Sequence, residues 1–139
     1  MAATFRVKLL TAERTVLERD TVSLQAPGTE GFLGVLAHHA PLITSLKAGP
    51  LILRGAEGAT EVFALSGGIL EVADNQATVL ADSLERAAEI DVPRARAALE
   101  RAERRLAERT RDTDIARAEA ALGRALNRLR IAERHGGRT

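Results

Sequence analysis

Two adjacent histidines, His38 and His39, are the side chains in this sequence that are best suited to acid–base or metal chemistry. Successive residues of a strand point to opposite faces, so these two imidazoles are poorly placed to bind one metal ion together. We therefore expect no metal site here. A position at a corner of the chain, or at a contact with another subunit, is the better interpretation of the pair.

Sequence signatures of nucleotide hydrolysis and of zinc chemistry are missing. A P-loop needs a glycine before its lysine, but Lys8 follows Val7 and Lys47 follows Leu46. The sequence contains neither G-x-G-x-x-G nor H-E-x-x-H, and it has no cysteine for a disulfide or a thiolate site. These observations predict a protein that is not an enzyme by itself and that requires no cofactor.

Composition excludes further classes of function. The only aromatic residues are Phe5, Phe32 and Phe63, which is too few for stacking on single-stranded nucleic acid, and a formal net charge of +1 argues against a polyanion binder. No apolar stretch approaches the ~20 residues of a membrane-spanning helix, and no signal-type segment precedes the first strand pattern. We expect a soluble or peripheral protein that does not bind nucleic acid.

A second polar group lies at Ile90-Asp91-Val92-Pro93-Arg94-Ala95. Asp91 can accept a hydrogen bond from an adenine amino group or a ribose hydroxyl, and Arg94 can pair with a phosphate in a fork geometry. Each has a simpler interpretation. Asp91 can cap a helix that starts there, and Arg94 can belong to a solvated helix face. The residues alone leave both interpretations open.

Short apolar segments with closely spaced turn residues fill the first part of the chain. Residues 31–49 predict a strand, a sharp corner at the histidines and Pro41, and another strand. Further strands are expected at residues 5–10, 21–26, 51–53, 60–65, 69–72 and 78–81. This pattern predicts an antiparallel β-sandwich or barrel over residues 1–84.

The composition changes at Asp82, and strong helix formers dominate from Asp91 onward. We expect a linker over residues 85–90, an antiparallel two-helix hairpin over 91–134 and a flexible tail over 135–139, which gives an α+β fold. The apolar seam of the first helix is Ala95, Leu99, Ala102 and Leu106, and that of the second is Ile115, Ala118, Leu122, Ala125, Leu129 and Ala132. Half of these residues are alanines. At ~1.5–3 kcal/mol for each large buried side chain, the hairpin should be marginally stable and able to move.

The stretch G-F-L-G-V-L-A-H-H-A-P-L-I-T-S-L-K-A-G resembles the signature of the epsilon subunit of bacterial and chloroplast F-type ATP synthases. The resemblance implies a non-catalytic central-stalk subunit that lies beside the gamma subunit and against the c-ring. Such a subunit couples proton-driven rotation to ATP synthesis, and its hairpin extends toward the alpha and beta subunits to inhibit ATP hydrolysis. The subunit contacts that it implies are Gly31, Phe32, His38, His39, Pro41 and Leu42.

The Ile90–Ala95 stretch resembles the I/L-D-x-x-R-A motif at which some bacterial epsilon subunits bind ATP, with Pro93 at a variable position. By this resemblance, ATP is a regulatory ligand and not a required cofactor. The ATP-binding residues that it implies are Glu85, Ile90, Asp91, Arg94, Ala95, Arg101, Arg124 and Arg128.

The leading interpretation is therefore an epsilon subunit, peripheral to the membrane on the cytoplasmic face of a bacterial plasma (inner) membrane. The alternative is a free-standing nucleotide-binding sensor that does not belong to a synthase. Co-purification with other synthase subunits distinguishes the two.

Overall fold

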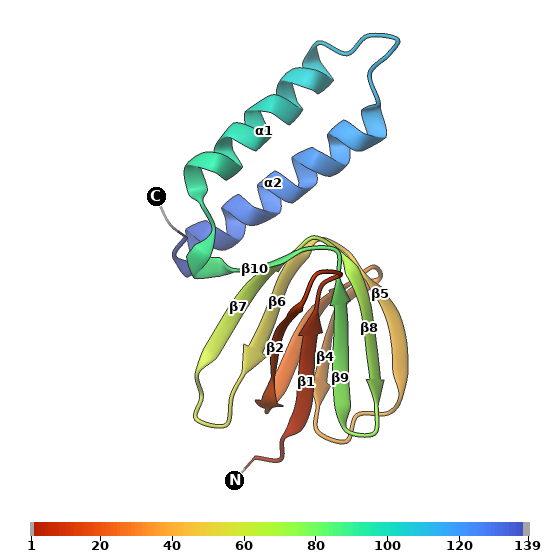
Figure 1. The fold of residues 1–139 in the computed structure, drawn as a ribbon, viewed down its shortest axis with the longest axis vertical. Helices are drawn as coiled ribbons and strands as arrows, with labels where there is room; N and C mark the ends of the chain where they lie inside the picture. Colours follow the sequence, from red (N-terminus) through yellow and green to blue (C-terminus); the bar gives the residue numbers. More distant parts are fainter. Residues whose placement is uncertain (1, 138–139) are drawn as a thin grey trace. The chain divides into compact units, whose positions relative to one another are not determined.

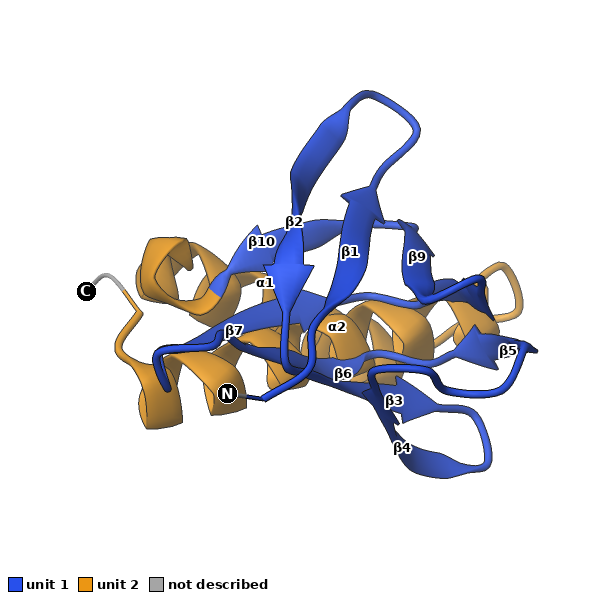
Figure 2. Ribbon diagram, turned by 90° about the horizontal axis from the view of Figure 1, so that it is seen from below, with its two compact units in different colours: residues 1–86 blue, residues 87–139 orange. Residues whose placement is uncertain are grey.

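The computed structural model of this protein describes residues 2–137. The chain divides into two compact units, Met1–Arg86 and Ala87–Thr139, which are coloured separately in Figure 2. The first unit is made of β-strands and the second of helices. Each is described by itself below.

The first unit contains ten strands among the described residues. In chain order they are β1 (Phe5–Leu10), β2 (Thr15–Thr21), β3 (Ser23–Gly28), β4 (Gly31–Leu36), β5 (Leu42–Leu46), β6 (Gly49–Arg54), β7 (Thr60–Leu65), β8 (Gly68–Ala73), β9 (Gln76–Ala81) and β10 (Leu84–Arg86).

These strands form two layers that pack face to face, as Figure 1 shows. One layer has the order β4-β3-β6-β7-β10, and the other has the order β5-β8-β9-β1-β2. The layers are joined at one corner, where Gly28 of β3 pairs with Leu46 of β5. Neighbouring strands are antiparallel except β1 and β9, which run parallel. The predicted sandwich followed by two helices is confirmed.

The core lies between the two layers because alternate residues of each strand point inward. Phe5, Val7 and Leu9 of β1 are all buried, as the alternation in the sequence predicts. The largest fully buried side chains of this unit are Leu9, Leu24, Leu51, Leu53, Phe63, Leu65 and Leu70. At ~1.5–3 kcal/mol each, their burial is the main favourable contribution to the stability of the sandwich.

The sequence predicts no strand over Thr15–Thr21, yet β2 occupies this range. Charged residues obscure its alternation, because β2 is an outer strand of its layer. Its charges pair across to β1, where Arg6 lies 3.6 Å from Glu18 and 3.4 Å from Asp20. The strand that was expected to begin at Thr21 begins at Ser23 as β3. Pairing with a neighbour, which sequence periodicity does not reveal, determines both boundaries.

A tight turn and a close approach of two strands fix the register of β8 and β9. Asp74 and Asn75 have φ angles of 51° and 58°, which is the left-handed pair that a two-residue hairpin between β8 and β9 requires. Gly68 has a φ of 153°, and a Cβ there would collide with the Leu80 carbonyl oxygen. Glycine is therefore required where β8 passes close to β9.

The second unit consists of a short 3-10 helix η1 (Ala87–Glu89) and the helices α1 (Val92–Ala107) and α2 (Ile115–His135). Each α-helix begins with an aspartate cap. Oδ1 of Asp91 accepts from the Arg94 amide at 3.1 Å, and Oδ1 of Asp114 accepts from the Arg117 amide at 3.0 Å. The cap at Asp91 agrees with the simpler of the two interpretations of that residue, and each cap is typically worth ~1 kcal/mol.

The two α-helices pack along a seam of alanines. Ala95 and Ala102 of α1 and Ala118, Ala125 and Ala132 of α2 are all buried. They recur every seven residues, so each helix presents one small-residue stripe to the other. The predicted seam residue Ile115 is 39% exposed, so the seam does not include the first residue of α2.

The C-terminal end of α2 is closed by glycines. Gly136 has a φ of 80°, and the amides of Gly136 and Gly137 both donate to the Ala132 carbonyl oxygen, at 2.8 and 2.9 Å. Of the flexible tail that the sequence predicts over residues 135–139, His135 belongs to α2, and residues 138–139 lie outside the described part of the chain.

Candidate functional site

The segment from Gly31 to Leu46 forms one edge of the sandwich. β4 pairs with β3 alone, and β5 pairs with β8 and reaches β3 only at Gly28. These two strands are therefore the outer strands of different layers, and the turn at residues 37–41 connects them. We call β4, this turn and β5 the β4–β5 edge (Figures 1 and 2).

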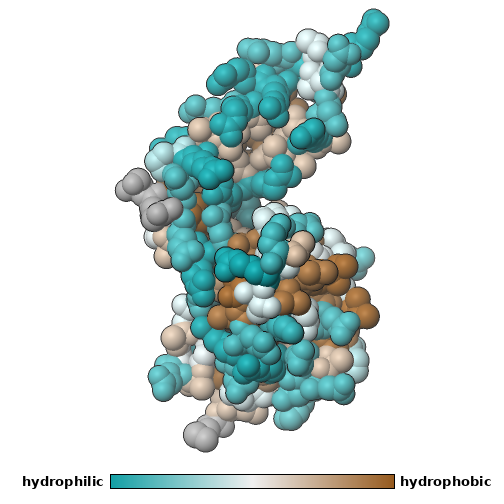
Figure 3. Space-filling model, viewed as in Figure 1, coloured by the Kyte–Doolittle hydropathy of each residue, from teal (hydrophilic) through white to brown (hydrophobic). Residues whose placement is uncertain are grey.

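The β4–β5 edge exposes large apolar side chains. Phe32 and Leu36 of β4 are 61% and 62% exposed, and Ile43 of β5 is 72% exposed. Ile69 of β8 and Leu80 of β9 extend this apolar character across the outer surface of their layer, because Ile69 pairs with Leu80. Figure 3 shows apolar side chains gathered over this part of the sandwich. Exposed apolar surface of this kind is typical of a binding surface.

The two histidines lie in the turn of the β4–β5 edge and not in a strand. His38 has a φ of 63°, and its amide donates to the Asn75 side-chain oxygen at 2.7 Å. His39 Nδ1 lies 2.6 Å from the Ala40 carbonyl oxygen, which makes the protonated Nδ1 a donor there. The turn is thus fixed to the β8–β9 hairpin through Asn75. The predicted subunit-contact residues that are exposed are Gly31, Phe32, His38 and Pro41, while His39 and Leu42 are half-buried.

The predicted ATP-binding residues begin at the N-terminus of α1. Oδ1 of Asp91 is engaged by the Arg94 amide, and its second oxygen accepts no hydrogen bond from the described residues. The side chain of Arg94 is exposed and forms no ion pair within residues 2–137. One carboxylate oxygen and one guanidinium are therefore available to a ligand at this helix end.

The arginines of the predicted site lie at equivalent positions beside the alanine seam. Arg94, Arg101 and Arg124 each come immediately before a buried alanine of the seam, and all three are exposed. In an antiparallel pair, equivalent flanking positions lie on the same side of the hairpin, because a two-fold rotation relates the helices. Arg128 shares a helix face with Arg124 and is half-buried.

Three further residues of the predicted ATP site have different surroundings. Ile90 and Ala95 are fully buried, so neither can contact a ligand directly with its side chain. Glu85 is half-buried on β10, where it pairs with Ala64 of β7. Glu85 thus belongs to the first unit, whereas the other predicted residues belong to the second.

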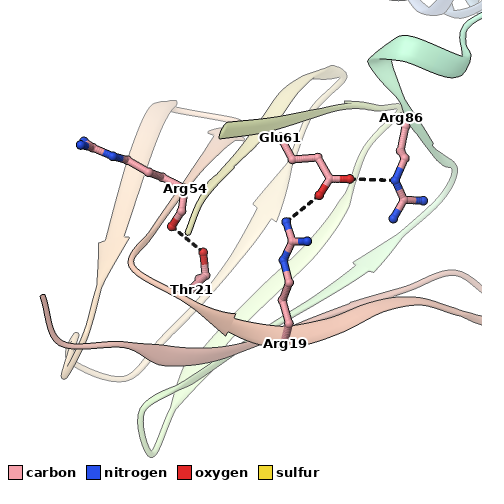
Figure 4. A network of polar contacts seen from close by, with 5 residues as sticks. All are labelled: Arg19, Thr21, Arg54, Glu61 and Arg86. Carbon is pink, nitrogen blue, oxygen red and sulfur yellow. Dashed lines mark hydrogen bonds and ion pairs between the residues drawn. The ribbon is translucent and has the colours of Figure 1, made fainter. Parts of the chain in front are cut away.

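A polar network that the sequence did not predict lies at the opposite edge of the sandwich (Figure 4). The Glu61 carboxylate accepts from Arg19 Nη2 at 2.6 Å and from Arg86 Nε at 2.7 Å. Thr21, a buried polar residue, donates to the Arg54 carbonyl oxygen at 2.8 Å. A signal for Glu61 does exist in the sequence, because it stands two residues before the core residue Phe63 and therefore points inward in β7.

The electrostatics of this network favour a charged carboxylate. Partial burial raises the pKa of Glu61, but the hydrogen bonds and positive charges of Arg19 and Arg86 outweigh burial and hold the pKa below its ordinary value. Within the described residues there is no cluster of histidine and acidic side chains that could hold a metal ion, and no helix is long and apolar enough to span a membrane.

Comparison with known proteins gives the class to which this fold and its exposed edge belong. Residues 4–87 match a family model described as the beta-sandwich domain of the ATP synthase delta/epsilon chain, and residues 88–133 match its long alpha-helix domain. A chain in the mitochondrial ATP synthase of Euglena gracilis has the same fold, with a TM-score of 0.83 over 97% of this chain and 84% of that chain, at 23% identity.

Curated relatives show to which of the two chains, delta or epsilon, this protein is similar. The ATP synthase epsilon chain of Moorella thermoacetica is 53% identical over 76% of this chain and 79% of its own length. That of Carboxydothermus hydrogenoformans is 54% identical over 77% of this chain and 79% of its own length. The chain therefore belongs to the ATP synthase epsilon chain family, as the sequence resemblance predicted.

Proposed function

We propose that this protein is a non-catalytic subunit of the central stalk of an F-type ATP synthase, where it couples proton-driven rotation to ATP synthesis and restrains ATP hydrolysis. The observation that carries this proposal is the match of both of its parts to delta/epsilon chain domains, together with relatives named epsilon chain at more than half identity. These findings favour the synthase subunit over a free-standing nucleotide sensor.

The β4–β5 edge is the surface that we assign to the rotor, where the partners are the gamma subunit and the c-ring. Its three most exposed apolar side chains, Phe32, Leu36 and Ile43, support this assignment, because burying apolar side chains is the main source of affinity in stable interfaces. The predicted contacts Gly31, His38, His39, Pro41 and Leu42 belong to the same edge.

The helical unit is the regulatory part in this proposal. Residues 87–139 contain thirteen arginines against nine acidic residues, so the hairpin is suited to acidic surfaces of the alpha and beta subunits. ATP is its regulatory ligand. The second Asp91 oxygen and the exposed guanidinium groups of three arginines support an ATP site; these are Arg94, Arg101 and Arg124. Glu85 and Arg128 are further polar groups of the proposed site. The buried residues Ile90 and Ala95 hold the helix in place.

An extended hairpin cannot keep arginines of both helices on one ligand. ATP therefore favours the folded hairpin and opposes inhibition of hydrolysis. As part of the complex, the protein is peripheral to the membrane, on the cytoplasmic face of a bacterial plasma membrane.

Co-purification tests the assignment of the rotor surface. We expect the tagged full chain to recover the gamma, alpha and beta subunits from membranes of its own organism, and we expect Phe32→Ser with Leu36→Ser to lose them. Glu57→Gln, in the exposed turn between β6 and β7, is the matched control and should recover the same subunits as the unchanged protein. Failure of the unchanged chain to recover any synthase subunit would contradict the proposed function. Equal recovery by the serine variant would contradict only the surface.

A further inference from the structure

One carboxylate connects the two ends of the strand order of the sandwich. In the path β10-β7-β6-β3-β5-β8-β9-β1-β2, the terminal strands are β10 and β2. Arg86 lies on β10, Arg19 lies on β2, and both donate to Glu61 on β7, one to each carboxylate oxygen. Glu61 therefore bridges the two layers at the edge opposite the β4–β5 edge, and its side chain is only 27% exposed.

The strand that Glu61 holds is short. β10 has three residues and pairs with β7 alone. Leu84 and Arg86 point to the same side, because they are two residues apart in a strand. Leu84 packs against the core, and the Arg86 guanidinium lies over the Phe63 ring, 5.5 Å from its centroid. In addition to backbone pairing, the contacts of Arg86 with Phe63 and Glu61 thus help to hold the end of β10.

Arg86 is also the last residue of the first unit, so the chain leaves the sandwich directly after it. Releasing β10 from β7 would add its three residues to the connection that leads to the helical unit. Three extended residues span about 10 Å, which is a large change for a short connection.

We propose that Glu61 is a latch. By holding Arg86, it keeps β10 paired with β7 and thereby sets where the sandwich ends and how far the helical unit can reach. Arg19 donates to the same carboxylate from the other layer. Glu61 therefore both holds β10 and connects the two layers of the sandwich. An anion that captures Arg86, or a pull on the connection, opens the latch without unfolding the core.

The latch is closed in neutral solution. Partial burial raises the pKa of Glu61, but the bonds and charges of its two arginines lower it by more, so the carboxylate stays ionised. A charge-assisted bond between groups that are only partly buried is weaker than a fully buried one, so opening remains accessible. This combination is what a releasable contact requires.

Limited digestion of the full chain with trypsin tests the latch at the Arg86–Ala87 bond. Trypsin cuts after arginine only where the backbone opens, and at low protease concentration the rate follows the open population. We expect Glu61→Gln to release the 1–86 fragment about ten-fold faster, from the loss of roughly one charge-assisted bond. Cleavage after Arg54, the last residue of β6, whose carbonyl oxygen accepts from the Val22 amide and the Thr21 hydroxyl, is the internal reference and should not accelerate.

Two further variants keep the test decisive. Glu18 of β2 forms an exposed ion pair with Arg6 of β1, so Glu18→Gln removes that pair and should leave cleavage after Arg86 unchanged. In the Arg86→Gln variant, amide hydrogen exchange over residues 84–86 should be about ten-fold faster than in the unchanged protein. This measurement tests the latch even if Glu61→Gln does not fold. The latch is overturned if Glu61→Gln accelerates cleavage after Arg54 as much as after Arg86. It is also overturned if Arg86→Gln leaves exchange in β10 unchanged.

Discussion

Asp91 and Asp114 cap the two helices with the same geometry, which allows the capping role of Asp91 to be separated from its proposed ligand role. Their Oδ1 atoms accept from the backbone amides three residues ahead at 3.1 and 3.0 Å. Only Asp91 belongs to the proposed ATP site. Replacing either aspartate by alanine should therefore reduce the stability of the helical unit by ~1 kcal/mol, whereas the effects on ATP affinity should differ.

The asparagine variant separates the two roles at Asp91 itself. Asparagine caps a helix about as well as aspartate, so Asp91→Asn should leave helix stability within a few tenths of a kcal/mol. It replaces the second acceptor oxygen by a donor and removes the charge. Loss of one hydrogen bond to a charged group, at ~1.5–3 kcal/mol, predicts ATP affinity about 10- to 100-fold lower.

Titration calorimetry with ATP and thermal unfolding followed by circular dichroism measure the two effects on the same samples. The unchanged protein should bind with a Kd between ~1 μM and ~1 mM, since two or three charged bonds are offset by the ordering of a marginal hairpin. Asp114→Ala should lower the unfolding temperature and weaken binding by no more than about five-fold, because only the ~1 kcal/mol of the lost cap can add to the ordering of the hairpin. If Asp91→Asn binds ATP like the unchanged protein, or if no heat appears at millimolar ATP, then Asp91 is a helix cap and the ligand role is wrong.

Three further outcomes follow from the sandwich. Because folding lowers the pKa of Glu61, its ionised carboxylate contributes to stability above the ordinary pKa of 4.5, and this contribution is lost as the pH falls through the folded pKa. Acid titration should therefore show a smaller loss of stability for Glu61→Gln than for the unchanged protein. Gly68→Ala should destabilise by several times the ~1 kcal/mol of an ordinary glycine replacement, because its Cβ would meet the Leu80 carbonyl; urea unfolding with an unchanged midpoint would contradict this. A fragment that ends at Arg86 should unfold at a higher urea concentration than one that ends at Leu84, because it keeps all of β10; equal midpoints would show that β10 adds nothing.

Local signals were sufficient for much of the fold. Some structural signals depend only on neighbouring residues, so they can be recognised without knowledge of the packing. Examples are the alternation in residues 5–10, the left-handed turn residues Asp74 and Asn75, and the aspartate before each helix. The ATP site stays a prediction. The chemistry of Asp91 and Arg94 suits a nucleotide, and the other arginines of the site come from the family resemblance alone.

Long-range pairing decided the rest. β2 is a strand because β1 lies beside it and matches its charges, and β10 is a strand because it pairs with the side of β7 that β6 leaves open, at residues 63–65. The exposure of Phe32, which in the sequence resembles a core residue, follows from the position of β4 at the free edge of its layer. The Glu61 network joins residues 42 and 25 positions apart in the chain, and no local pattern specifies such partners. The sequence determined which segments are strands and helices wherever their own periodicity was clear, and tertiary structure determined which charges meet, because that depends on how the layers close.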